Sequence, residues 1–241
     1  MRGRLVARAS LTPTQVDAMF GLLAVHFVGV SRGQFERDLA EKNWALLLED
    51  DEGGLAGFST ILFYDSIHDG EPVSVVYSGD TIVAPSHWNS PGLSRSWIRA
   101  VMELHSRAAT SKLWWLLLTA GFRTYRFLPL FWKTFHPRYD AEPSDATRRW
   151  MDELARERFG DRFDASAGIV RFDNPYRLGP ELSETPRGKR DDPHVAYFLS
   201  RNPGFVDGDE LVCLTEIAPG NLTRAGWRMV DPSGALARSL A

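Results

Sequence analysis

The sequence contains little cysteine, little net charge and no long hydrophobic segment. Its single cysteine, Cys213, excludes an intramolecular disulfide and a cysteine-based zinc site. The formal net charge is −3, so the chain lacks the excess of positive charge that marks nucleic-acid-binding proteins. The longest apolar runs, 113–118 and 127–132, are far shorter than the roughly 20 residues that span a bilayer. We therefore expect a cytoplasmic protein that binds neither metal nor nucleic acid and has no membrane span.

The spacing of apolar residues predicts two helices followed by three antiparallel strands. Apolar residues recur at helical spacing over 13–26 and again after Ser31. The segments 44–49, 55–64 and 73–83 are rich in apolar residues and are separated by turns that contain glycine and aspartate. This order indicates a helical start and then a meander of strands.

A loop, a helix, a strand and another helix follow. The loop contains proline and glycine, and it leads into an amphipathic segment, 93–106, with apolar residues three and four apart. A short apolar strand is predicted at 113–118. Helical spacing returns at 122–132, where Pro129 should kink or end the helix because proline cannot donate a backbone hydrogen bond.

The last hundred residues differ in character and suggest an appended unit. They contain one polar helix, 144–159, a weak strand at 168–172 and a final apolar strand at 210–217. A chain of 241 residues exceeds a usual single core but is short for two. We predict a main domain, 1–141, and a C-terminal extension, 142–241, that packs on the same sheet.

Two features around the third predicted strand are candidates for a functional site. Within the strand, Ser78 and Asp80 place polar groups among apolar neighbours. Such burial costs free energy unless the groups have hydrogen-bond partners, so these residues are candidates for a site. After the strand, the loop before the next helix resembles a phosphate cradle, because free N–H groups at a helix N-terminus attract anions. Gly92 and Ser94 are small enough to allow that approach, although Pro91 lacks an N–H. An ordinary helix N-terminus is the alternative.

The element order and this loop resemble the GNAT superfamily of N-acyltransferases over residues 12–139. In that family a strand ends at Val-x-Pro, and a loop Arg/Gln-x-x-Gly-x-Gly/Ala opens the next helix. Here Val83-Ala84-Pro85 is followed by a loop in which Asn89 replaces the Arg or Gln and Ser94 replaces the last small residue. The resemblance implies an α/β fold with a mixed, mostly antiparallel sheet flanked by helices. We expect the strands 73–83 and 113–118 to diverge at their C-terminal ends and open a cleft.

The resemblance also implies the reaction and its residues. An acyl group would pass from an acyl-CoA, acetyl-CoA or acyl-carrier-protein thioester to a small-molecule amine, by direct attack in a ternary complex. Asp80 matches the place of the general base, with Ser78 beside it. The family's tyrosine acid aligns with Phe131, so either Tyr125 or Tyr139 replaces it or the thiolate leaves without a proton donor. The residues implied to bind the cosubstrate are Val83, Asn89, Ser90, Gly92, Leu93, Ser94 and Arg95.

Three alternatives remain open from the sequence. Asp80 is as well explained by a structural carboxylate that caps a turn or pairs with an arginine. The aromatic residues around Trp115, Tyr125 and Phe131 either pack the core or line a pocket for a long acyl chain. The chain as a whole is either a transferase, including one resembling the N-acyl amino acid synthases, or a non-catalytic binding or regulatory module with the same fold. The oligomeric state is not predicted.

Overall fold

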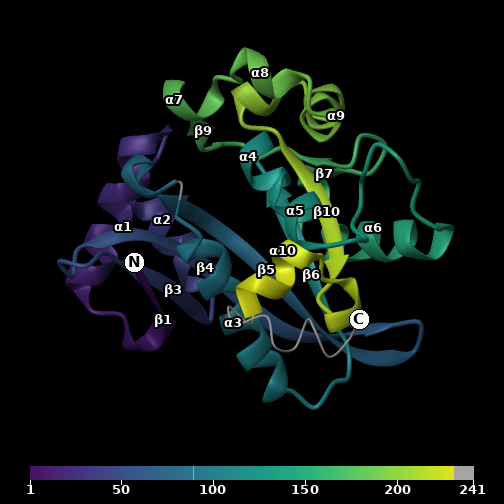
Figure 1. Cartoon of the computed structure of the whole chain (residues 1–241), viewed down its shortest axis with the longest axis horizontal. Coiled ribbons are helices and arrows are strands. Elements are labelled where there is room, and N and C mark those ends of the chain that lie inside the picture. The colour runs from purple at the N-terminus through teal and green to yellow at the C-terminus, as the bar shows by residue number, and fades with distance from the viewer. Residues whose placement is uncertain (89, 231–241) are drawn as a thin grey trace.

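The structure is a computed structural model that describes residues 1–88 and 90–230, and its centre is one eight-stranded sheet (Figure 1). The strands follow the spatial order β1-β3-β4-β5-β6-β10-β8-β7. Every neighbouring pair is antiparallel except β5 and β6, which run parallel. Their bounds are β1 (Arg2–Ala7), β3 (Trp44–Glu49), β4 (Leu55–His68), β5 (Glu71–Val83), β6 (Leu113–Thr119), β10 (Glu210–Glu216), β8 (Ile169–Val170) and β7 (Phe163–Asp164).

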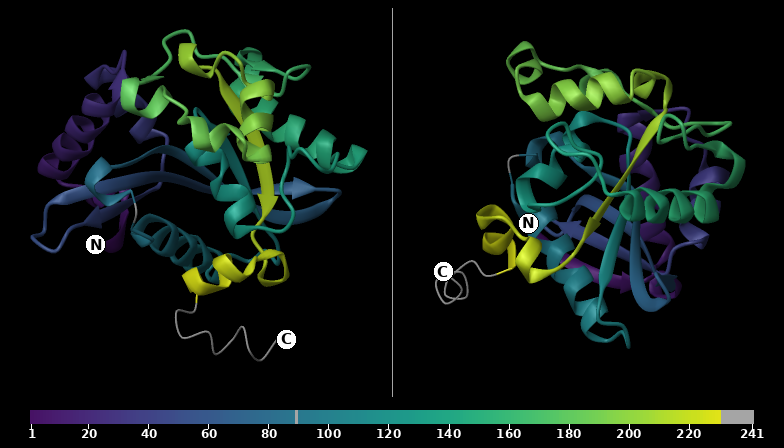
Figure 2. Two further views of the ribbon diagram at one scale, coloured as in Figure 1. Left: turned by 45° about the horizontal axis from the view of Figure 1, so that its top comes forward. Right: turned by 90° about the vertical axis from the view of Figure 1, so that its right-hand side faces the viewer.

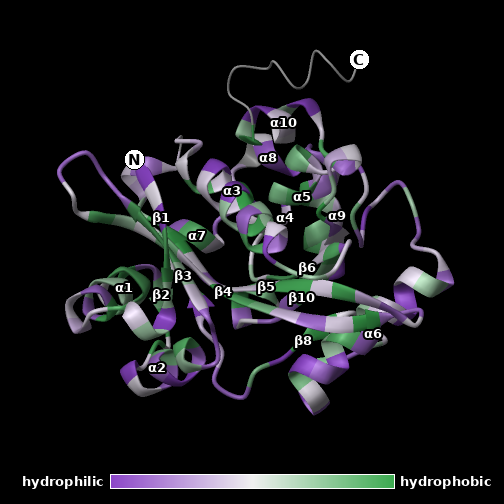
Figure 3. Cartoon of the chain, turned by 90° about the horizontal axis from the view of Figure 1, so that it is seen from below, coloured by the Kyte–Doolittle hydropathy of each residue, from purple (hydrophilic) through white to green (hydrophobic). Residues whose placement is uncertain are grey.

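Helices cover both faces of the sheet, which confirms the predicted α/β class with a mostly antiparallel sheet. Figure 3 shows α1, α2 and α6 on one side, and α3, α5 and α10 on the other, with apolar surfaces turned inward. A two-stranded sheet pairs β2 with β9. The remaining bounds are α1 (Pro13–His26), β2 (Phe27–Val28), α2 (Arg32–Ala40), α3 (Gly92–Ser106), α4 (Phe122–Tyr125), α5 (Phe127–Phe131), α6 (Asp145–Phe159), β9 (Arg177–Leu178), α7 (Pro180–Ser183), α8 (Arg187–Arg190), α9 (Pro193–Arg201) and α10 (Arg224–Val230).

The predicted helix ends agree with local capping chemistry. Thr12 and Gln15 form a reciprocal capping box at the start of α1. The hydroxyls of Ser31 and Ser144 accept backbone N–H groups at the starts of α2 and α6. Among the described residues, no helix is both long enough and apolar enough to cross a membrane.

Two elements differ from the sequence-based expectation. β1 was not predicted; it pairs along the full length of β3 and forms an edge of the sheet. The helix expected over 122–132 is two short helices, α4 and α5, that meet at Arg126. The break precedes Pro129 by three residues because proline cannot donate to the carbonyl four residues earlier, that of Tyr125.

The C-terminal extension contributes three strands to the sheet. Figure 2 shows β10 passing through the middle of the molecule. It pairs with β6 although 92 residues separate Thr119 from Leu211. Strands β8 and β7 continue the sheet beyond β10. The division of the chain at residue 141 stays a prediction, since one sheet runs through both segments.

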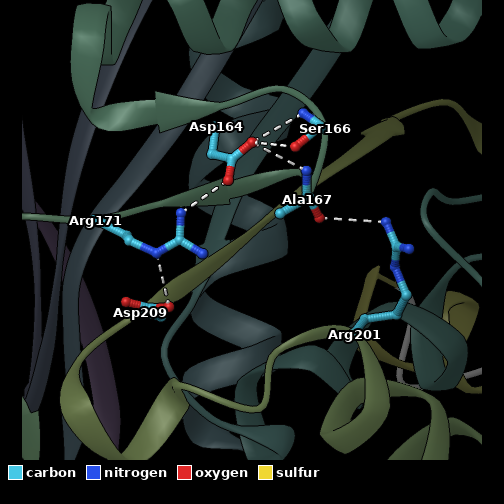
Figure 4. Close-up of polar contacts among 6 residues, drawn as sticks. All are labelled: Asp164, Ser166, Ala167, Arg171, Arg201 and Asp209. Carbon is cyan, nitrogen blue, oxygen red and sulfur yellow. Dashed lines mark hydrogen bonds and ion pairs between the residues drawn. The ribbon is translucent and has the colours of Figure 1, made fainter.

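A polar cluster ties the β7–β8 turn to the start of β10 (Figure 4). The Asp164 carboxylate accepts hydrogen bonds from the hydroxyl and N–H of Ser166, at 2.6 and 3.0 Å, and from the N–H of Ala167 at 3.2 Å. Arg171 donates to Asp164 at 2.9 Å and to Asp209 at 3.1 Å. These contacts lower the pKa of Asp164 far below its usual value, so the ionised carboxylate stabilises this turn.

Candidate active site

The parallel strands β5 and β6 separate part of the way along β5. Their pairing runs from Ser74 opposite Leu113 to Ser78 opposite Leu117, and β5 continues unpaired on that side to Val83. The predicted divergence is therefore confirmed. A strand that loses its neighbour presents N–H and C=O groups that can pair with another extended molecule.

A β-bulge lies where the strands part. Between the pairs Ser59–Thr81 and Ile61–Ser78, one residue of β4 faces two residues of β5, Gly79 and Asp80. A Cβ on Gly79 would lie 2.6 Å from both Lys42 Cε and Thr60 Oγ1, so a larger residue would collide there. The bulge therefore depends on this glycine and sets the direction of the Asp80 side chain.

Two cavities adjoin at this point. The first, which we call the polar cavity, has a volume of about 400 Å³ and lies against α2 and α6. The second, the apolar cavity, has a volume of about 460 Å³ and lies against α3 and α4. Because β5 and β6 have separated, the two meet beside the bulge. The residues that line both are Phe27, Ser78, Thr81, Leu117, Thr124 and Leu178.

Carboxyl groups with raised pKa values line the polar cavity. Burial raises the pKa of Asp80 to about 6, against the charge of Lys42, which lowers it. Burial also raises the pKa of Glu210 to about 8, and the charges of Asp80 and Asp38 add to this shift. Glu210 thus holds its proton to a higher pH than Asp80 does. Groups that exchange protons in this range are suited to general acid–base chemistry.

Lys42 supplies a buried positive charge beside the bulge. Its side chain is 6% exposed, and its ammonium donates a hydrogen bond of 2.9 Å to the Asp38 carbonyl. Burial lowers the pKa of this amine, while the charge of Asp80 raises it. The ammonium lies 5.4 Å from the centre of the Tyr77 ring, which Arg158 approaches to 5.3 Å. Lys42 is therefore placed to favour the ionised form of Asp80.

Aromatic rings form one wall of the apolar cavity. Trp97 and Trp115 pack with ring centres 4.2 Å apart, and Phe122 and Phe127 line the same space. The indole N–H of Trp115 donates to Ser78 Oγ at 2.9 Å. That bond orients Ser78 and leaves its hydroxyl hydrogen available for an acceptor where the cavities meet.

Basic groups surround the outer part of the apolar cavity. Arg123, Arg126, Lys189 and His87 contribute to its lining. The guanidinium of Arg123 lies 5.2 Å from the ring centre of Trp88, which is 40% exposed. Arg123, Arg126 and Lys189 therefore place positive charge along this cavity from elements that follow the loop in the chain.

The structure brings together part of the predicted cosubstrate loop. Val83, Ser90, Leu93 and Ser94 line the apolar cavity. Asn89 lies outside the described residues. Arg95 follows in α3, and the structure does not place it in the lining of either cavity.

Gly92 occupies a different position from the one expected of a phosphate cradle. It is buried, and a Cβ there would lie 2.4 Å from Cε of Met1. Its N–H donates to the Ser90 hydroxyl at 3.2 Å. The first turn of α3 therefore faces the apolar cavity through Leu93 and Ser94.

Tyr125 lies away from both cavities. Its side chain is fully buried, and its hydroxyl donates to the Pro137 carbonyl at 2.9 Å. Burial raises the pKa of this phenol well above its usual value. Phe131 also belongs to the core, so of the three aromatic residues singled out from the sequence only Trp115 lines a cavity.

Sequence reasoning missed several residues of the polar cavity. Lys42 comes from the turn after α2, Arg158 from the last turn of α6 and Glu210 from the start of β10. Glu210 follows Asp207 and Asp209 in the sequence, so nothing there distinguishes it from its acidic neighbours. All three reach the cavity through contacts between distant segments.

Comparisons with known proteins give matches only among solved structures. No family model matches the chain, and neither does any curated protein. A probable N-acyltransferase from Enterococcus faecalis is similar at 16% identity and a TM-score of 0.41, over 56% of this chain and 33% of that one. The chain thus spans about one third of that protein.

Two further similar structures contain CoA or a bisubstrate analog that includes it. The GNAT family N-acetyltransferase YhbS from Escherichia coli, in complex with CoA, is 18% identical with a TM-score of 0.36, over 53% of this chain and 68% of that one. The enzyme AAC(6')-Iy, in complex with a bisubstrate analog, is 13% identical with a TM-score of 0.37, over 64% and 89%. One of these structures carries the name of the GNAT family whose resemblance was noted from the sequence.

Proposed function

We propose that this chain is a GNAT-type acyltransferase that moves an acyl group from an acyl-CoA thioester to a small-molecule amine. The observation that carries the proposal is the meeting of the two cavities where β5 and β6 separate. A thioester in one cavity and an amine in the other would come into contact only there. Direct attack in a ternary complex then needs no covalent enzyme intermediate.

The donor fits the apolar cavity by its chemistry. The pantetheine arm of coenzyme A contains two amides, which can pair with the edge of β5 between Gly79 and Val83 that β6 leaves unpaired. Its phosphates would lie beside Ser90 and Ser94, near the positive charges of Arg123 and Lys189. An acyl carrier protein presents the same arm and is the alternative donor.

The chemical step assigns roles to two side chains. Asp80 accepts a proton from the amine, directly or through water, and the amine nitrogen then attacks the thioester carbonyl carbon. The carbon–sulfur bond breaks, giving an amide and a thiolate that takes up a proton. Ser78, held by the indole of Trp115, donates a hydrogen bond to the departing sulfur. The role of Asp80 is the one implied by the family resemblance, whereas that of Ser78 follows from its hydrogen bond to Trp115.

A thiol-release assay tests the proposal. Acyl-CoA donors are mixed with a panel of amines, and free CoA is measured together with the mass of the acylated product. We expect release that depends on the amine, and Asp80→Asn should lower kcat by roughly a hundredfold to ten-thousandfold, as for loss of a positioned base.

Asp69→Asn is the matched control, because Asp69 is exposed in a turn at φ 50°, which asparagine tolerates. Its rate should equal that of the wild type. Absence of transfer from every donor, or an unchanged rate in Asp80→Asn, would contradict the proposal.

A non-catalytic module that binds an acyl-CoA is the second candidate. The position of Tyr125 favours it, since its hydroxyl is bonded to the Pro137 carbonyl, away from both cavities, and does not reach a departing thiolate. In that case acyl-CoA would raise the melting temperature without release of thiol. A ligand at 100 times its Kd stabilises by about 2.7 kcal/mol, so binding without turnover is readily measured.

A further inference from the structure

The polar cavity combines acidic and basic side chains in nearly equal number. Five acidic and four basic residues line it. A site that selects a purely cationic amine, such as a polyamine, would be expected to carry a strong excess of negative charge. The lining residues with charge are Asp38, Glu41, Asp80, Asp173 and Glu210 together with Arg37, Lys42, Arg158 and Arg162.

The two arginines that the C-terminal extension contributes to the polar cavity, Arg158 and Arg162, make different contacts. Arg158 forms an ion pair with Glu41, which holds it between α2 and α6. Arg162 uses only its Nε, which donates to the Phe159 carbonyl at 3.2 Å. Within the described part of the chain, the terminal nitrogens of Arg162 have no hydrogen-bond partner. An amine in this cavity that lacked an anionic group would lie near guanidinium charges that repel it.

We infer that the acceptor of the proposed reaction carries a carboxylate as well as its amine, as an amino acid does. The carboxylate binds the guanidinium of Arg162, with Arg158 beside it, and the amine faces Asp80. A planar guanidinium matches a carboxylate through two parallel hydrogen bonds. A volume of about 400 Å³ lies near the lower end of ligand pockets, which suits a small acceptor. The inference rests on the proposed function.

Binding measured without a donor tests the inference. The probes are the common amino acids and, for each one that binds by calorimetry or thermal shift, two analogues: the amine without its carboxylate and the acid without its amine. We expect the amino acid to bind at least tenfold more tightly than either analogue. Arg162→Gln should weaken amino-acid binding roughly 10- to 100-fold and should not weaken binding of the carboxylate-free amine, which loses a repelling charge.

Two variants serve as controls. Arg162→Lys keeps the positive charge and should restore part of the affinity. Arg156→Gln removes an exposed arginine of α6 that pairs with Asp152, and it should bind as the wild type does. In turnover, Arg162→Gln should raise KM for the amino acid tenfold or more with kcat nearly unchanged.

The outcomes separate this inference from the proposed function. Carboxylate-free amines that bind and react as well as amino acids, or equal effects of Arg162→Gln and Arg156→Gln, would overturn the inference and leave the transferase standing. Tighter binding of phosphoethanolamine than of every amino acid would overturn the carboxylate assignment. Amino-acid binding that depends on Arg162, with no acyl transfer, would support the inference and contradict the transferase.

Discussion

Replacing Asp80 with asparagine should stabilise the protein at neutral pH while it removes the proposed base. Burial raises the pKa of Asp80 from 3.8 to about 6. Each pKa unit corresponds to 1.36 kcal/mol, so the ionised carboxylate costs the folded state up to about 3 kcal/mol. Asparagine has the same shape and no charge, and it avoids this cost.

The pH dependence of this effect follows from linkage. The folded state binds the Asp80 proton more tightly than the unfolded state, so wild-type stability relative to Asp80→Asn falls as the pH rises from about 4 to about 6. Unfolding in urea at five pH values between 4 and 8 measures the difference. We expect the two proteins to agree near pH 4 and to differ most above pH 7.

Asp164→Asn should show the opposite sign. The pKa of Asp164 is lowered by hydrogen bonds from Ser166 and Arg171 and from the Ala167 backbone, so its ionised form contributes stability. That contribution of Asp164 is present above the ordinary aspartate pKa and is lost as the pH falls.

The account of Asp80 would be refuted by either of two results. One is a stability difference between wild type and Asp80→Asn that is constant over the whole pH range. The other is an Asp80→Asn protein that is less stable than the wild type at pH 8.

Three further predictions concern the neighbours of this site. Lys42→Met removes the charge that lowers the Asp80 pKa, so the acidic limb of the pH–rate profile should move upward from about pH 6. An acidic limb at the same pH as in the wild type would show that Lys42 does not act on Asp80. Tyr125→Phe loses the hydrogen bond to Pro137 and should lower the free energy of unfolding by about 1 kcal/mol with kcat unchanged; a hundredfold loss of kcat would restore Tyr125 as the acid. If the aromatic wall of the apolar cavity holds the acyl chain, affinity should rise from acetyl-CoA to octanoyl-CoA by up to about 0.8 kcal/mol per methylene, and a flat series would contradict that use of the wall.

Local chemistry made much of the fold predictable. Helix 144–159 is found as α6 because its serine cap and apolar spacing lie within a few residues of one another. The final strand, 210–217, is found as β10 because its apolar run is bounded by polar residues. β1 escaped prediction since its exposed half is polar and its pairing with β3 joins segments about 40 residues apart.

The site was only partly predictable for the same reason. Asp80 was recognisable because a carboxylate inside an apolar strand costs free energy unless it is paired or takes part in a reaction. Lys42 and Glu210 were not, since their approach to Asp80 depends on α2 and β10 reaching the bulge from distant parts of the chain. The contact of Gly92 with Met1 cannot be read from the loop sequence, because it joins the loop to the start of the chain.

The most direct test of the central claim is the two-substrate rate pattern. Initial rates of acylated product are measured while the acyl-CoA and the acceptor amine are varied together. Two adjoining cavities predict a ternary complex, so double-reciprocal plots should intersect, and a dead-end acceptor analogue should not abolish donor binding. Parallel lines, together with an acylated enzyme detected by mass spectrometry, would contradict direct transfer where β5 and β6 separate. The absence of any acylated product would contradict it as well.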